Sequence, residues 1–161
     1  MNTPNDAVAF VLEKSKASLH RFTADLSPAE FLHRPTEKAN CTAWLIGHLA
    51  LSDRNCLKRL GAPLPELPAG FERQFSREEG CPQASEFGDA SKLIGIFDQH
   101  RDLLIAAIRK ATPEQLNKPV EKPMPMFSTV GELMAFMSLH TAMHAGQITI
   151  IRRSLGRPPI V

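Results

Sequence analysis

Three histidines occupy positions from which they could share a metal ion. His140 and His144 are four residues apart in a segment whose apolar residues recur every three or four positions, so both lie on the apolar side of a predicted helix. Residues four apart on a helix have β-carbons about 5–6 Å apart, which lets two imidazoles bind one ion through bonds of about 2.0–2.1 Å. His48 lies on the apolar side of another predicted helix, four residues after Trp44. If the two helices pack side by side, one divalent ion can bind all three rings.

Buried histidines also have a structural interpretation, in which each ring is a hydrogen-bonded core residue. That interpretation stays open for His48 taken alone. Two inward-facing imidazoles on adjacent turns are harder to satisfy in a dry core, and a shared cation satisfies both. The same spacing occurs in helical zinc proteases, where a glutamate follows the first histidine as general base. Thr141 occupies that position here, which excludes the protease interpretation.

Other polar residues near these histidines are weaker candidates. His100 falls on the apolar side of a third predicted helix and is either a fourth ligand or, as the favoured interpretation, a structural core residue. Gln147, three residues after His144, is either a hydrogen-bonding support for the ligands or a solvated polar group. Asp53 is expected to face solvent. The remaining histidines are expected at the surface or in turns: His20 and His33.

Four long helices are predicted to position these residues, with capping residues at their starts and glycine or proline at their ends. Gly146 lies inside the last of them and weakens it by about 1 kcal/mol relative to alanine, which predicts close packing against a neighbouring helix. Either Asn40 or Thr42 is expected to cap the second helix. The predicted helices run from Pro4 to near Asp25, from about Thr42 to Leu60, from near Ser85 to Ala111, and from Val130 to Leu155.

The segment between the second and third helices is rich in helix-breaking residues. Residues 61–84 hold four prolines and three glycines, which predicts a long irregular crossover. No segment combines two-residue alternation with β-branched enrichment, so essentially no sheet is expected. The sequence therefore predicts an all-α protein, a four-helix bundle with a long crossover whose connectivity is not simply up and down.

The bulk composition is that of an ordinary globular protein. With 161 residues, of which 43% are hydrophobic and 22% charged, the chain is expected to form a single domain over residues 1–161. Its net charge of +2 gives no electrostatic reason to expect a nucleic acid or an anionic membrane as partner. No apolar run approaches the roughly 20 residues that span a bilayer, and the N-terminus lacks a signal-peptide pattern, so a cytoplasmic location is expected.

The three cysteines also favour a cytoplasmic location. They are odd in number and widely spaced, which fits a reducing environment better than a disulfide framework. Each is interpreted as a small apolar residue. They are Cys41, Cys56 and Cys81.

Several of these motifs, taken in order, resemble the DinB-like superfamily of bacterial metal-binding bundles, a DNA-damage-inducible family. The resemblance extends over nearly the whole chain and includes the helix start Thr129-Val130-Gly131-Glu132-Leu133. Its main motifs are Trp44-Leu45-Ile46-Gly47-His48-Leu49-Ala50, His140-Thr141-Ala142-Met143-His144-Ala145-Gly146-Gln147-Ile148 and Leu155-Gly156-Arg157-Pro158-Pro159.

The resemblance implies a four-helix bundle with a long crossover and often a homodimer. It implies a zinc or nickel ion bound by His48, His140 and His144, all of which are present in this chain. Characterised members of the superfamily resemble thiol-dependent transferases or isomerases that use low-molecular-weight thiols.

Two functional hypotheses follow. In the first, the protein is a metal-dependent enzyme, a thiol-dependent transferase or a hydrolase, because three neutral imidazoles leave the ion's double charge intact and a coordination position open. A thiol or water then attacks a small electrophilic substrate. The arginines near the C-terminus could contact carboxylates of such a thiol, or could be solvated charges at a helix end. They are Arg152, Arg153 and Arg157.

The second hypothesis is a non-catalytic, stress-related bundle in which the metal is structural or absent. It is favoured by the lack of a clear general base near the histidines in the sequence.

Overall fold

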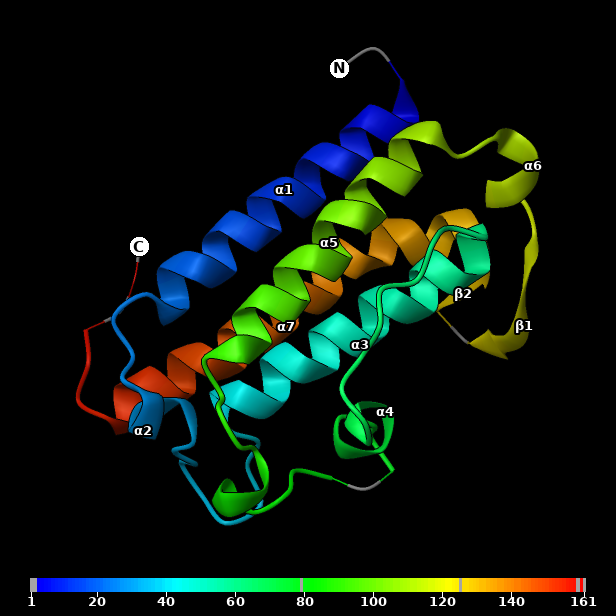
Figure 1. Ribbon diagram of the computed structural model, residues 1–161. Helices are drawn as coiled ribbons and strands as arrows, with labels where there is room; N and C mark the ends of the chain where they lie inside the picture. The colour runs from blue at the N-terminus through cyan, green and yellow to red at the C-terminus, as the bar shows by residue number, and fades with distance from the viewer. Residues whose placement is uncertain (1–2, 79, 125, 159, 161) are drawn as a thin grey trace.

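The structure is a computed structural model that describes residues 3–78, 80–124, 126–158 and 160. Within them, the main elements are four long helices (Figure 1), namely α1 (Pro4–Thr23), α3 (Thr42–Leu60), α5 (Lys92–Lys110) and α7 (Val130–Ser154). Helices α1 and α3 each pack against both α5 and α7, which closes a four-helix bundle. Helices α3 and α5 run in the same direction, opposite to α1 and α7 (Figure 1). The prediction of an all-α four-helix bundle that is not simply up and down is confirmed.

The parallel arrangement of α3 and α5 explains the long crossover between them. Helix α3 has 19 residues and is therefore roughly 28 Å long, a length that the chain must retrace before α5 can begin. The crossover contains two short helical turns, α4 (Phe71–Gln74) and the 3₁₀ turn η1 (Ala84–Glu86). The prediction that the third helix starts near Ser85 is wrong. The left-handed backbone of Gly88, with φ of 59°, separates η1 from α5.

The starts of α1 and α7 follow the predicted capping signals, whereas no side chain caps α3 or α5. Reciprocal hydrogen bonds between the N-cap residue and the third helical residue open α1, α7 and two short helices, α2 (Pro28–Phe31) and α6 (Pro113–Leu116). Helix α3 differs, because its N-cap is Cys41 and no side chain caps it, so the prediction of Asn40 or Thr42 is wrong. Thr42 already lies in the first turn, fully buried.

The C-terminal stop of the last helix also agrees with the sequence. Gly156 follows α7 with a φ of 73°, a left-handed conformation that favours glycine. Pro159, part of the predicted stop, lies outside the described residues. None of the helices in the described ranges is both long enough and apolar enough to cross a membrane.

A small antiparallel hairpin corrects the prediction that the chain has essentially no sheet. It consists of β1 (Pro119–Met124) and β2 (Phe127–Thr129) and leads directly into α7. Strand β1 contains prolines and β2 is only three residues long, so neither carries a two-residue alternation that a sequence pattern could detect. The Phe127 side chain is buried against the bundle.

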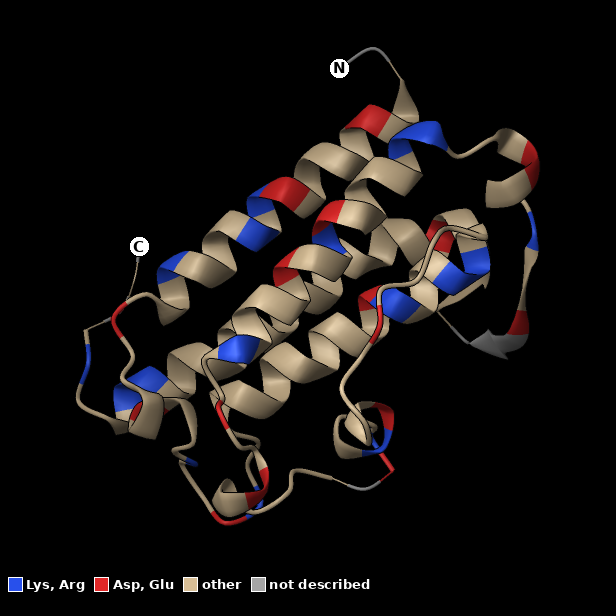
Figure 2. Cartoon of the chain, in the orientation of Figure 1, with Lys and Arg blue, Asp and Glu red and all other residues tan. Residues whose placement is uncertain are grey.

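The bundle interior is divided into two apolar clusters with a polar layer between them. At the centre of this layer Arg101 of α5 is fully buried and forms a two-point ion pair with Asp53 of α3, with N–O distances of 2.7 and 3.0 Å. The same guanidinium donates to Thr141 Oγ1 of α7 at 3.0 Å and to Ser15 Oγ of α1 at 3.1 Å. One side chain therefore connects all four long helices. The charge distribution along these helices is drawn in Figure 2.

The burial of Asp53 contradicts its predicted exposure to solvent. The carboxylate has no accessible surface, although a charged group is seldom buried in this way. Its burial is tolerated because Arg101 donates a hydrogen bond to each carboxylate oxygen. The two residues are 48 positions apart, so no local sequence pattern could predict this ion pair.

We predict that Arg101→Met lowers the free energy of unfolding by about 3–5 kcal/mol, because it leaves the Asp53 carboxylate buried without a cation. Urea unfolding followed by circular dichroism measures the change. The double variant Asp53→Leu/Arg101→Met is expected to regain much of the loss.

The matched control is Arg109→Met, which removes the exposed ion pair with Glu13 and is expected to cost at most about 1 kcal/mol. Equal decreases in the free energy of unfolding for Arg101→Met and Arg109→Met would show that the buried ion pair stabilises the protein no more than the exposed one.

Candidate metal centre

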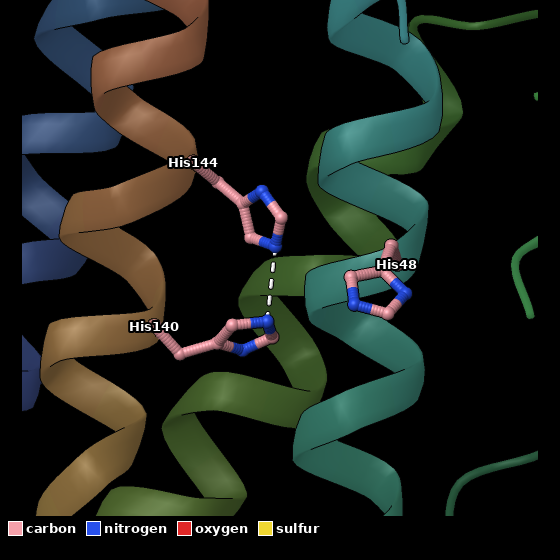
Figure 3. Close-up of side chains that lie close together, drawn as sticks. All are labelled: His48, His140 and His144. Atoms are coloured by element: carbon pink, nitrogen blue, oxygen red, sulfur yellow. Dashed lines mark hydrogen bonds between the residues drawn. The ribbon is translucent and has the colours of Figure 1, made fainter. Parts of the chain in front are cut away.

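The three histidines singled out in the sequence meet inside the bundle. His48 projects from α3 toward His140 and His144, which lie on successive turns of α7 (Figure 3). All three are buried, and one ring nitrogen from each lies within 4.8 Å of the others. The Nε2 atoms of His140 and His144 are 2.9 Å apart. The two helices thus bring together residues nearly a hundred positions apart, as the sequence predicted.

The orientation of His48 is set by the crossover. Its Nδ1 lies 3.0 Å from the backbone carbonyl oxygen of Phe75. A carbonyl can only accept a hydrogen bond, so Nδ1 carries the proton and the Nε2 lone pair is free. Nε2 is buried and has no hydrogen-bond partner among the described residues. Trp44 stacks on the ring, with centroids 4.8 Å apart and planes within 4°.

Gly47 explains how the crossover reaches His48. A β-carbon at this position would lie 2.3 Å from the ring of Phe75, so only glycine leaves room for that ring against α3. Phe75 itself is buried and places its carbonyl beside His48. Sequence reasoning missed Phe75, because a backbone carbonyl acting on a distant side chain leaves no residue-type signal.

Gln147 supports the second ligand position. Its Oε1 lies 2.8 Å from Nδ1 of His144, and an amide oxygen accepts a hydrogen bond from Nδ1–H just as the Phe75 carbonyl does. His144 therefore also directs an unprotonated Nε2 toward the centre. The alternative that Gln147 is only a solvated polar group is not what the structure shows. Such outer partners fix the tautomer and the ring orientation of metal-binding histidines.

The histidine rings are neutral at ordinary pH. Burial lowers the pKa of His48 to about 4, against the opposing effect of the hydrogen bond to the Phe75 carbonyl, and the neighbouring His144 and Arg77 lower it further. Burial likewise lowers the pKa of His140 to about 3 and also lowers that of His144. Only the neutral imidazole can bind a metal, so an ion does not have to displace the second proton of an imidazolium at any of the three rings.

The donor set fits a divalent cation. Two nitrogens that bind one ion with bonds of about 2.1 Å are at most about 4.2 Å apart, so the cluster needs only a small side-chain adjustment. The orphaned Nε2 of His48 and the close approach of His140 and His144 are both polar features that a cation would satisfy. Three neutral donors would leave the ion's charge intact.

The other histidines do not join this cluster. His100 is fully buried, and its Nδ1 bonds the carbonyl of Ile96 in its own helix at 2.8 Å, which agrees with the structural interpretation. His20 bonds Asp98 at 2.7 Å and His33 bonds Ser154 at 2.9 Å, both away from the centre.

A cavity of about 410 Å³ adjoins His48 and His140. Its walls are mostly apolar, with Phe136 and Met143 among them, but two arginines also line it. Arg59 keeps its Nε atom buried without a partner among the described residues, and Arg77 brings a second positive charge. Of the described residues that line the cavity, none is a carboxylate.

The arginines that line the cavity, Arg59 and Arg77, are not those that the sequence suggested as contacts for a carboxylate-bearing thiol. Arg152 is buried and pairs with Asp25, while Arg157 bonds Glu30 at 2.9 and 2.7 Å. Both anchor the C-terminal end of α7 to the segment that follows α1. Their charges are therefore already matched by carboxylates, and they do not line the cavity.

The fold and the histidine cluster define a class of four-helix bundles that present three histidines from two helices. The chain belongs to the DinB superfamily, whose sequence profile matches residues 12–148. Its structure is similar to that of YfiT from Bacillus subtilis, described as "a probable metal-dependent hydrolase with an unusual four-helix bundle topology". The two chains share 17% sequence identity with a TM-score of 0.72, over 98% of this chain and 91% of the other. At this identity the likeness shows a shared fold. Among curated proteins, no match was found.

We predict that His48→Ala, His140→Ala and His144→Ala each lower the affinity for a divalent ion by at least about 100-fold, because one of three donors is lost. Titration calorimetry with Zn²⁺ or Ni²⁺ on untagged protein measures the affinity. The control His20→Ala removes a histidine outside the cluster and is expected to bind like the unaltered protein. Unchanged affinity in all three cluster variants would contradict the site.

Proposed function

We propose that this protein is a metal-dependent enzyme in which a low-molecular-weight thiol, or water in its place, attacks a small electrophilic substrate. The observation that carries the proposal is the buried three-histidine cluster beside a cavity with apolar walls and two arginines. Zinc or nickel are the ions we expect, since imidazole donors suit both. A divalent ion bound there supplies a Lewis acid that lowers the pKa of a thiol or water.

Different residues of the chain would orient the metal-binding imidazoles and bind the thiol or the substrate. Phe75 and Gln147 hold two imidazoles with their Nε2 atoms facing inward. Arg59 and Arg77 provide positive charge for a carboxylate-bearing thiol or substrate, and the apolar wall around Phe136 excludes water from the electrophile.

The absence of a carboxylate among the described residues of the cavity wall favours a thiol over water as the nucleophile. A thiol is acidic enough to lose its proton to solvent when a nearby cation stabilises the thiolate. Water is a far weaker acid, and hydrolysis normally recruits a general base. The same absence favours the second candidate, in which the metal only stabilises the bundle.

We predict that the metal-loaded protein transfers an anionic thiol to a chromogenic electrophile, and that Arg59→Gln/Arg77→Gln raises the KM for that thiol about tenfold or more. A neutral thiol such as 2-mercaptoethanol is expected to show little change in KM. The matched control is Arg73→Gln, an exposed arginine of α4 that does not line this cavity.

Cobalt substitution distinguishes the two candidates without relying on turnover. In the enzyme, adding thiol is expected to produce a thiolate-to-cobalt absorption band. A coordination sphere that stays unchanged with every thiol, together with inactivity toward thiols, esters and amides, would favour the structural role.

We further propose that the protein is a homodimer formed through α7. Three large apolar side chains on this helix are exposed, with Leu139 at 53%, Met143 at 56% and Ile150 at 60%. Gly146 lies between them, and no described atom comes within 4 Å of a β-carbon built there. The prediction that Gly146 packs closely against a neighbouring helix is thus wrong within this chain, whereas a second copy could approach the helix at this point.

We predict that Leu139→Glu/Ile150→Glu converts the dimer to a monomer, because burying two carboxylates opposes association. Sedimentation equilibrium measures the mass. Leu64→Glu, at an exposed apolar residue of the crossover, is the control and should leave the dimer intact. A protein that is already monomeric before substitution contradicts the proposal.

A further inference from the structure

Two of the three cysteines lie next to each other in the fold. The Sγ atoms of Cys41 and Cys81 are 3.7 Å apart, although the residues are 40 positions apart in the chain. Cys41 is the residue immediately before α3 and is fully buried, whereas Cys81 lies in the crossover and is only partly buried. Cys56 stands apart from them in the apolar core. Cys41 and Cys81 both pack in an apolar cluster, as the interpretation of small apolar residues predicts, but the sequence did not indicate that they contact each other.

An arginine is fixed beside the more accessible sulfur. Nη2 of Arg34 lies 3.1 Å from Sγ of Cys81. The same nitrogen donates to the backbone carbonyl of Cys81 at 2.8 Å and to that of Pro82. These bonds hold a positive charge where it stabilises a thiolate.

The two thiols consequently differ in acidity. A hydrogen bond from Cys41 lowers the pKa of Cys81, and the charge of Arg34 acts in the same direction against the effect of burial. The contact with Cys81 and burial raise the pKa of Cys41. A partly exposed, acidic thiol with a buried thiol at contact distance is the arrangement of an attacking and a resolving cysteine.

We propose that Cys81 and Cys41 form a thiol modification site that reduces a hydroperoxide and closes to a disulfide. The thiolate of Cys81 attacks one peroxide oxygen, the O–O bond breaks, and the departing hydroxide or alkoxide takes a proton from solvent. Cys81 is left as a sulfenic acid. Sγ of Cys41 then attacks that sulfur, the S–O bond breaks, and water leaves with the thiol proton. Two electrons pass from the two thiols to the hydroperoxide.

The disulfide would tie the crossover to the start of α3. The sulfurs have to approach from 3.7 Å to the disulfide bond length of about 2.05 Å. The same crossover carries Phe75, whose carbonyl orients His48, and Arg77 at the cavity wall. Oxidation would thus restrain the segment that covers the histidine cluster, whether or not the proposed enzymatic function is correct.

The test treats the reduced full-length protein with a small excess of hydrogen peroxide, followed by alkylation and non-reducing peptide mapping. The expected result is the loss of two hydrogen atoms from the intact mass and a peptide pair joined through Cys41 and Cys81. Cys56 should remain alkylatable, and Cys56→Ser should form the same bond. In Cys41→Ser, Cys81 should stop at the sulfenic acid and be captured by dimedone. Arg34→Gln should slow alkylation of Cys81 at neutral pH several-fold.

The peptide map of the unaltered protein decides the matter even if a variant fails to fold. Free thiols at both Cys41 and Cys81 after peroxide treatment overturn the proposal. So does oxidation of Cys56 at the same rate as Cys81, because it would show that accessibility during unfolding and not the local arrangement governs the reaction.

Discussion

The rest of the bundle depends on the hydrogen bonds and the ion pair made by the buried guanidinium of Arg101. It is fully buried, and its hydrogen bonds reach Ser15, Asp53 and Thr141, one residue on each of the other long helices. A buried charge is costly unless each of its hydrogen-bond donors has an acceptor. The acceptors on the other three helices reach the Arg101 guanidinium only when the helices have one particular axial offset and rotation. Apolar packing alone would tolerate several such arrangements, since it is non-directional.

This constraint positions the histidine cluster. Asp53 lies five residues after His48 on α3, and Thr141 lies between His140 and His144 on α7. When Arg101 fixes Asp53 and Thr141, it also fixes the axial register of the two helices that carry the imidazoles. The helices that carry the histidines are therefore held in place before any ion binds. A metal ion would bind imidazoles that are already neutral and oriented.

The crossover supplies what the helices lack. A straight bundle would leave Nδ1 of His48 without an acceptor, and the carbonyl of Phe75 provides one because Gly47 lets the aromatic ring lie against α3. The crossover also brings Arg77 to the cavity and Cys81 to Cys41. The crossover that runs back along the bundle between two parallel helices therefore contacts both the cavity and the start of α3.

The sequence by itself determined the helical class, most helix ends and the three histidines. Each of these depends on local chemistry: caps act within three residues, and the spacing of His140 and His144 follows from the helical repeat. Tertiary structure decided the burial of Asp53, the Phe75 contact, the arginines of the cavity, the cysteine pair and the small hairpin. All of these except the hairpin join residues far apart in the chain, where only the packed geometry selects the partners, and the strands of the hairpin are too short to carry a pattern.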